Sequence, residues 1–567
     1  MNFYFILLAV AFTIATSEAH RHPDVPPQAR DQLQPKLHSQ SHAQAKAQAL
    51  PLAQPHAQPH AQPHAQPHAQ PHAQPHAQLH VQPQPHPQHQ AQVLVQPQPL
   101  VQPLVQPLVQ PLVQPIVQPI VPPLAQPQAQ IPVQPHVQSQ PQAPPHGQLP
   151  YPPPYPHHEH KVKILWIEQK LDHFNKSDTR AWFMRYMVND KFYRPHGPIF
   201  INIGAEWPIV NSSITSGHFH DMAGIYHAII YYTEHRYYGE SRPTNSLSTS
   251  DLQYLTYQQA IEDLAHFIRV MKSQPGFSAS RVIMLGCSYA GSLAIWLKRE
   301  YPDLVNGIWA TGAPVFYKFD FSDYMVNVGR SIRIAGGEAC FQRIHQAAYE
   351  LYHLNDSRIK YDLYRLGYLE PLEGMENEIA SVVQHSNGDG TRDFCRRLLE
   401  GHNVLFTLGA LLKEKSYDAA GEHDVRNPNY TKYIGRQWMY QVCSQFGNFQ
   451  TTSSFYHPFT NSAPLNYMAA ECKAIFGPQF TMDFISQQIE KVNSLYGGFH
   501  PNITNAYYTH GQLDPWRTTG IIHDLMSFTL PDVSHCGDTN SITIADNNEL
   551  RASKERISAL VGQWIRQ

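Results

Sequence analysis

Proline at every fourth position limits what the first 160 residues can fold into. From Gln54 to Ala77 the tetrapeptide QPHA repeats six times, and from Val101 a second tract reads VQPLVQPLVQPLVQPIVQPIV. Proline fixes φ and has no backbone N–H, so neither a helix nor a sheet ladder forms in such a tract. An extended polyproline II segment is therefore expected. Histidine-rich repeats can bind metal, but nothing here fixes a coordination geometry, so a solvated spacer is the favoured interpretation.

Several features are typical of a protein that enters the secretory pathway. Residues 1–19 are apolar with small side chains at Ser17 and Ala19, which predicts a signal peptide, followed by a Pro/Gln/His-rich linker over 20–160. The apolar stretch is shorter than the ~20 residues of a spanning helix, so no membrane anchor is expected. Six cysteines without a C-x-x-C pair are consistent with disulfides. Five N-x-S/T sequons predict glycosylation, at Asn175, Asn211, Asn355, Asn429 and Asn502. A secreted or lysosomal location is expected.

The charge of the chain excludes some classes of partner. The formal net charge of −3 is too small to indicate nucleic acid or an anionic membrane. No basic run is interleaved with aromatic residues, which also argues against nucleic-acid binding. No cofactor and no metal site are expected, and a homodimer is left open.

Beyond the linker, strand-like and helical segments alternate. Apolar runs typical of buried strands lie within 197–207, 227–241, 281–288 and 304–314. Apolar residues at helical spacing over 253–272 predict an amphipathic helix between two of them. This alternation indicates βαβ units and a parallel sheet, and hence an α/β fold.

A long helical stretch interrupts this pattern. Helical and loop-like segments dominate to about residue 490, and strand character returns within 505–515 and 526–536. A final helix is expected to bury Ile557, Leu560, Val561, Trp564 and Ile565. The predicted domains are an α/β core in two parts, 161–325 and 491–567, with a mainly helical insertion over 326–490.

Ser288 lies in the segment LGCSYAGSL, directly after the apolar run RVIM. The nucleophile-elbow pattern is G-x-S-x-G, but Ala290 replaces its second glycine, which appears one place later as Gly291. A serine nucleophile needs a histidine base oriented by a carboxylate, and α/β-hydrolases place them in the order Ser, Asp, His. Past the insertion, Asp514 ends one strand segment and His535 ends the next. The order predicts a catalytic triad.

Six sequence blocks recur in the order of a known peptidase family. They are QKLDHF (169–174), PIFINIGAE, EHRYYGES (234–241), GCSYAGSL, GQLDPW (511–516) and SHCGD. Together they resemble the S28 serine peptidases, the group of prolylcarboxypeptidase, dipeptidyl peptidase II and thymus-specific serine protease. The resemblance runs from about Lys161 to the C-terminus. It implies an α/β-hydrolase core, a helical cap and exopeptidase action on peptides, often beside proline.

The resemblance also implies a role for particular residues. Ser288 is the implied nucleophile, Asp514 the orienting acid and His535 the general base. The oxyanion hole is expected from the backbone N–H of Tyr289 and from a second donor in the loop around Glu206. Glu206 also matches an acidic position that could hold the amino terminus of a substrate.

Three more residues are candidates for the substrate pocket. Trp516 is expected to contact the residue before the cleaved bond, with a core tryptophan as the alternative. Trp438 is a second candidate, from the cap. Ser292 stands where prolyl-specific members often carry methionine, which puts a strict preference for proline in doubt.

The cysteines have two kinds of implied pairing. The resemblance implies two disulfides, Cys443–Cys472 and Cys340–Cys395. Cys287 and Cys536 remain, each adjacent to a predicted triad residue. Two buried thiols are favoured there over a bond between neighbouring loops. Such a bond would require Cα atoms within ~7 Å of each other.

Other acidic and basic residues are interpreted as structural. Asp172 and His173 precede the expected sheet strands. Residues 234–236, Glu-His-Arg, are expected to form a buried ion-pair and hydrogen-bond network. Asp263 lies within a predicted helix and is expected to be a solvated surface carboxylate.

The sequence thus favours a serine exopeptidase that forms an acyl-enzyme. Carboxypeptidase and dipeptidyl peptidase activities both remain open. An esterase or lipase on the same fold is one alternative. Another is a secreted binding or matrix protein without activity, whose proline-rich segment is the functional part.

Overall fold

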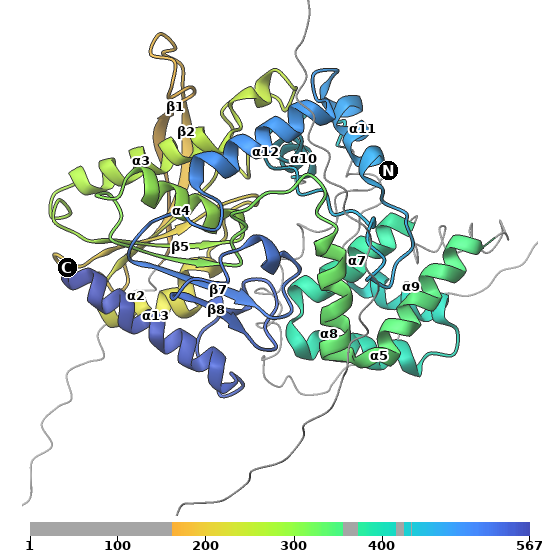
Figure 1. Ribbon diagram of the computed structural model, residues 1–567. Coiled ribbons are helices and arrows are strands. Elements are labelled where there is room, and N and C mark those ends of the chain that lie inside the picture. The colour runs from red at the N-terminus through yellow and green to blue at the C-terminus, as the bar shows by residue number, and fades with distance from the viewer. Residues whose placement is uncertain (1–160, 355–371, 416–424, 432–433) are drawn as a thin grey trace, which may run out of the picture. The chain divides into compact units, whose positions relative to one another are not determined.

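The structure is a computed structural model and describes residues 161–354, 372–415, 425–431 and 434–567 (Figure 1). The predicted signal peptide, the proline-rich linker and the sequon at Asn355 lie outside these residues. The other sequon asparagines are exposed, namely Asn175, Asn211, Asn429 and Asn502. Across the described segments, no helix combines the length and the apolar character that a membrane crossing requires.

Within the described residues, eight strands form one sheet in the order β1-β2-β4-β3-β5-β6-β7-β8. Their bounds are β1 (Lys163–Lys170), β2 (Ala181–Asn189), β3 (Ile199–Ile203), β4 (Ile229–Thr233), β5 (Val282–Cys287), β6 (Gly307–Thr311), β7 (Ala506–Gly511) and β8 (Ser527–Leu530). β2 pairs antiparallel with β1 and β4, and all other pairs are parallel. The central parallel strands are almost wholly buried, as in a sheet covered on both faces. The predicted α/β fold is confirmed, while the largely exposed β1 and its partner β2 are not foreseen by the sequence pattern.

Helices cover both faces of this sheet (Figure 1). α3 (Tyr257–Ser273) and α4 (Tyr289–Glu300) pack on one face, and α2 (His218–Tyr226) and α13 (Asn548–Arg566) pack on the other. The side of α13 predicted to face the core does so. Its buried residues are Ile557, Val561 and Trp564, and its partly buried residues are Leu560 and Ile565. Because both faces are closed, a ligand can reach the sheet only at its ends, and in parallel sheets it binds at the carboxyl ends of the strands.

The chain between β6 and β7 is mainly helical, as predicted. Its helices are α5 (Asp323–His353), α7 (Leu372–His385), α8 (Asn387–Glu400), α9 (Val404–Lys415), α10 (Gly435–Gln441), α11 (Leu465–Phe476) and α12 (Met482–Tyr496). α5, α7, α8 and α9 are grouped around an apolar cluster of their own (Figure 1). α10, α11 and α12 pack instead into the cluster that contains α3 and α4. The insertion therefore consists of a cap with its own core and a second part that is continuous with the α/β core.

Three disulfides join distant parts of the described chain. Two lie in the insertion. Cys340–Cys395 joins α5 to α8, and Cys443–Cys472 joins the π-helical segment η4 (Val442–Phe446) to α11. The third joins Cys287 to Cys536, whose Cα atoms are 5.9 Å apart. The expectation of two buried thiols is wrong, because β5 and the loop after β8 reach the same edge of the sheet and bring these residues within bonding range.

Residues 234–236 form the buried polar network that the sequence predicts. Glu234 is fully buried and pairs with Arg185 from β2. The same carboxylate accepts from the backbone N–H of Ile209 at 3.1 Å. This network ties β4 to the loop that follows β3.

Asp263 is buried rather than solvated, so the prediction of a surface carboxylate is wrong. Arg236 donates to it through Nε at 2.7 Å, and His173 Nε2 lies 2.7 Å from its Oδ1. Arg236 is itself fully buried, and a buried charge requires a partner. Arg236 lies in the loop after β4, so the helical pattern around Asp263 gives no sign that this carboxylate has a buried partner. Asp172 and His173 follow β1, so they do not precede the first strand as predicted.

Candidate active site

Ser288 lies in a tight turn between β5 and α4. Its backbone has φ 58° and ψ −132°, a region that residues other than glycine adopt at a cost in energy. The turn requires Gly286, where a Cβ would lie 2.2 Å from the Ala290 carbonyl oxygen. It also requires Gly291, where a Cβ would lie 2.7 Å from the Cβ of Ala313. The second glycine has thus moved one place along the motif, and the close strand-to-helix approach of a nucleophile elbow is retained.

Asp514 and His535 form a buried hydrogen-bonded pair. They follow β7 and β8, and His535 Nδ1 lies 2.8 Å from Asp514 Oδ2. The other carboxylate oxygen accepts from the backbone N–H of Trp516 at 2.8 Å. Burial lowers the pKa of His535, but the charge and hydrogen bond of Asp514, with the charge of Glu206, outweigh burial and raise it. The Nε2 atom of His535 is buried and has no hydrogen-bond partner among the described residues, so it is available to a reacting group.

One cavity brings together most of the predicted site residues. Its lining includes Glu206, Ser288, Tyr289, Trp438, Trp516 and His535. Aromatic and apolar side chains complete the wall, among them Pro314, Tyr317, Met439, Val442, Phe446 and Phe449. Asp514 does not line the cavity and contacts it through His535. The predicted nucleophile and base therefore share one aromatic cavity.

Ser292 lies behind the cavity wall. It is fully buried in α4, where its hydroxyl donates to the carbonyl of Pro314 and accepts from the hydroxyl of Tyr317 at 3.4 Å. Four residues along a helix is about one turn, or roughly 6 Å along its axis, which carries Ser292 away from the site of Ser288. Ser292 therefore supports the ring of Tyr317 instead of contacting the cavity itself.

Glu206 places a buried carboxyl group in the cavity wall. It follows β3, and its Oε2 has no hydrogen-bond partner among the described residues. Burial raises the pKa of Glu206 to about 7, against the opposing effects of its own backbone N–H and of the charge of His535. No lysine or arginine is among the described residues that line the cavity. A buried carboxyl group in an apolar cavity favours a cationic group on a ligand.

Gln384, at the end of α7, was not foreseen by the sequence. Its Oε1 accepts from the hydroxyl of Tyr324 at 2.8 Å and from Trp516 Nε1 at 3.1 Å. Its backbone carbonyl accepts from the N–H of His535 at 3.0 Å. A single glutamine in a helical insertion carries no sequence signal for this role.

Trp516 lines the cavity and also belongs to the apolar cluster of the cap.

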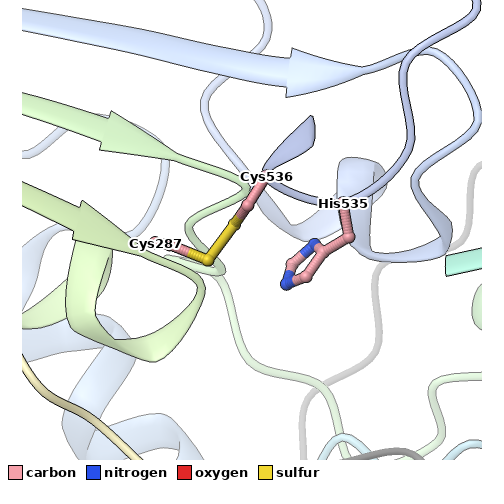
Figure 2. A group of neighbouring side chains, drawn as sticks. All are labelled: Cys287, His535 and Cys536. Carbon is pink, nitrogen blue, oxygen red and sulfur yellow. A yellow bond between two sulfur atoms is a disulfide. The ribbon is translucent and has the colours of Figure 1, made fainter. Parts of the chain in front are cut away.

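A second cavity, of about 230 Å³, shares Trp207, Cys287 and His535 with the first. Figure 2 shows His535 beside the bond that joins Cys287 to Cys536. One ligand atom from each of these three residues lies within 4.8 Å of the others. Cysteine binds metal as the thiolate, and both sulfurs are held in the disulfide, so the trio does not fit a metal ion in this form.

The match to a protein-family model begins beyond the proline-rich linker. The family model described as serine carboxypeptidase S28 matches residues 169–378 and 401–557. Thymus-specific serine protease of Mus musculus is 29% identical over 445 residues, which cover 71% of this chain and 87% of that protein. Lysosomal Pro-X carboxypeptidase of Mus musculus is 27% identical over 473 residues, which cover 73% of this chain and 91% of that protein. The chain belongs to the S28 family and is a serine peptidase.

Proposed function

We propose that Ser288, His535 and Asp514 are the catalytic triad of this peptidase. The observation that most supports it is the buried Nε2 of His535, which has no partner within the described part of the chain and lies in the same cavity as a serine held at positive φ. Ser288 Oγ attacks the substrate carbonyl while His535 Nε2 accepts its proton. Asp514 accepts from the Nδ1–H of His535, which orients the imidazole and stabilises the imidazolium that forms.

The remaining steps use the same groups in reverse. The backbone N–H of Tyr289, with a second donor from the loop around Glu206, stabilises the oxyanion of the tetrahedral intermediate. His535 then gives its proton to the leaving amine, and the acyl group stays on Ser288. Water, deprotonated by His535, attacks this ester and releases the acyl product.

Within the exopeptidases, we infer an enzyme that accepts a free amino terminus. Glu206 is a carboxyl group in a cavity whose described lining holds no lysine or arginine, and it suits a substrate ammonium. A terminal carboxylate would need a basic side chain. No lysine or arginine lines either of the two cavities among the described residues.

The aromatic wall suits a substrate with proline before the cleaved bond. Trp516, Trp438 and Tyr317 line the cavity, and aromatic side chains pack well on a flat, apolar ring. Ser292 is not among the described residues that line the wall, so its hydroxyl does not oppose this packing. Preference for proline is therefore part of the proposed specificity.

We also propose that the protein passes through the secretory pathway to a secreted or lysosomal location. Three disulfides are typical of oxidising compartments. The sequon asparagines within the described residues are exposed, as glycosylation requires.

A fluorophosphonate probe tests the triad directly. The wild-type glycoprotein should be labelled, and Ser288→Ala should lose the label. Ser292→Ala is the matched control: it removes a serine hydroxyl one turn further along, inside α4 and outside the cavity, and should keep the label. Absence of labelling in the folded wild-type protein would support the catalytically silent alternative and contradict the enzyme.

A set of end-blocked peptides tests the inferred specificity. Acetylation of the substrate amino terminus should abolish cleavage, whereas amidation of its carboxyl terminus should leave cleavage largely unchanged. The reverse result would identify a carboxypeptidase. Hydrolysis of simple esters together with failure on every peptide would favour the esterase alternative.

A further inference from the structure

The Cys287–Cys536 disulfide links the two halves of the proposed catalytic apparatus. Cys287 is the residue before Ser288, and Cys536 is the residue after His535 (Figure 2). The bond spans 249 residues of sequence, against 55 and 29 for the other two. The bond therefore holds together two turns that are far apart in the sequence and meet only in the folded protein.

Both turns have backbone conformations that need support. Ser288 has φ 58° and Cys536 has φ 55°, values that residues other than glycine rarely adopt. Gly312 packs beneath the same group, since a Cβ there would lie 2.9 Å from the ring of His535 and 3.1 Å from Cys536 Sγ. A small change in either turn would therefore change the separation of Ser288 and His535.

The same disulfide is also the most accessible of the three. Cys340, Cys395, Cys443 and Cys472 are almost completely buried. Cys287 and Cys536 are partly exposed and line the second cavity, of about 230 Å³. That volume is several times the ~30 Å³ of a water molecule, so solvent and a small thiol can approach these sulfurs before the others.

We propose that Cys287–Cys536 is a positioning disulfide that makes peptidase activity depend on its oxidation state. The inference rests on the proposed triad. With the bond intact, Ser288 and His535 are held in reacting geometry. When it is reduced, the two turns separate slightly while the remainder of the fold persists.

Reduction follows ordinary thiol–disulfide exchange with a dithiol reductant. A thiolate of the reductant attacks one protein sulfur, forms a mixed disulfide and releases the other sulfur as a thiolate, which takes up a proton. The second thiol of the reductant then attacks the mixed disulfide. The products are a cyclic oxidised reductant and two protein thiols, so that two electrons pass to the protein.

The fold should survive this step. Cys340–Cys395 and Cys443–Cys472 remain closed because they are buried. His535 keeps its hydrogen bond from the backbone N–H to the carbonyl of Gln384. The expected effect is therefore on kcat, and misplacement of reacting groups by about 1 Å typically costs on the order of 10²-fold.

The test treats the full-length oxidised glycoprotein with increasing dithiothreitol in the presence of EDTA. The chelator is needed because freed thiols beside His535 would bind metal ions. Samples are alkylated with iodoacetamide and mapped by mass spectrometry, while kcat, KM, fluorophosphonate labelling and circular dichroism are followed in parallel. Alkylation of Cys287 and Cys536 should come first, with a fall in kcat of about 10- to 100-fold, little change in KM, and recovery on reoxidation by oxidised glutathione.

Two results would overturn the proposal. One is unchanged kcat when Cys287 and Cys536 are fully alkylated. The other is loss of activity that follows alkylation of the four buried cysteines instead. Absence of fluorophosphonate labelling in the oxidised enzyme would contradict the proposed triad. This outcome differs from the two above, which contradict only the redox proposal.

The double variant Cys287→Ala/Cys536→Ala supplies the matched control. It should show a lowered kcat that no longer responds to dithiothreitol, and its acid limb in the pH profile of kcat/KM should shift, because the surroundings of His535 change. Wild-type kcat in the folded double variant would contradict a positioning role. If this variant does not fold, the dithiothreitol series on the wild-type protein decides.

Discussion

The backbone N–H of His535 donates to the carbonyl of Gln384 at 3.0 Å, so the cap helix α7 holds the loop that carries the proposed general base. Two further bonds strengthen this contact: Ser534 Oγ donates to the carbonyl of Val383 at 2.7 Å, and Ser534 N–H donates to Asn387 Oδ1 at 2.9 Å. The cap therefore covers the cavity and also positions the loop that carries His535 of the proposed triad.

Replacing Gln384 by methionine should weaken substrate binding. The change keeps the size of the side chain and the backbone carbonyl, but leaves the hydroxyl of Tyr324 and Nε1 of Trp516 without their acceptor. Each buried donor left unpaired costs roughly 1–3 kcal/mol. Because Trp516 lines the cavity, we expect KM to rise several-fold with a smaller change in kcat, measured with a peptide substrate.

Gln384→Glu is the control for this prediction, because it keeps an acceptor oxygen in the same place. It should retain a KM closer to that of the wild type at low pH, where the new carboxyl is neutral. Equal KM values for the methionine variant and the wild type would show that the hydrogen bond to Trp516 does not shape the cavity.

Replacing Gly312 by alanine should displace His535. A Cβ at this position would lie 2.9 Å from two atoms of the imidazole ring, and the ring cannot retreat without lengthening its 2.8 Å contact with Asp514. We expect kcat to fall by about 10²-fold, the scale of a ~1 Å misplacement of a catalytic group.

Gly276→Ala separates this effect from backbone strain. Gly276 also has positive φ, at +88°, but no atom lies within 4 Å of the Cβ position. Both variants should lose roughly 1–2 kcal/mol of stability from strain, and only Gly312→Ala should lose activity. Equal kcat values in the two variants would show that packing beneath His535 is unimportant.

Local sequence patterns were sufficient for the parallel sheet and for the placing of Ser288, Asp514 and His535 at strand ends. Each of those inferences needs only a short apolar run and the residue that follows it. The pairing of Cys287 with Cys536 could not be derived in this way, because it depends on which strands are neighbours in space. Gln384 was missed for the same reason, since its partners lie far from it in the sequence.

Replacing Glu206 by glutamine should move the acid limb of kcat/KM to lower pH. The charge of Glu206 is one of the effects that raise the pKa of His535. Without it the pKa of His535 falls, so the neutral imidazole that accepts a proton is present at lower pH.

The comparison substrate for this experiment is a peptide with an acetylated amino terminus. If Glu206 binds the substrate ammonium, the glutamine variant should lose most of its advantage for the free peptide over the acetylated one. An acid limb that stays in place, measured with either peptide, would show that Glu206 and His535 do not interact.

His510→Asn should reduce the loss of stability at acid pH. Burial lowers the pKa of His510 to about 4, whereas in the unfolded chain it lies near ~6.5. Between these values the unfolded state binds more protons, so the free energy of unfolding falls as the pH drops through this window. A shift of this size corresponds to about 3 kcal/mol. Urea unfolding at pH 7 and pH 5 should show a smaller difference for the variant, and an unchanged difference would contradict the assignment.

Asp263→Asn should destabilise the protein without a specific effect on catalysis. The change leaves Arg236, which is fully buried, without its counter-charge, and breaking a buried ion pair typically costs 3–5 kcal/mol. Glu555→Gln, which removes a carboxylate from the exposed side of α13, is the control and should change the free energy of unfolding by less than about 0.5 kcal/mol. Activity per folded molecule should be unchanged in both, because Asp263 does not line the cavity that contains Ser288. Equal unfolding free energies for the two variants would mean that Arg236 finds another partner or water.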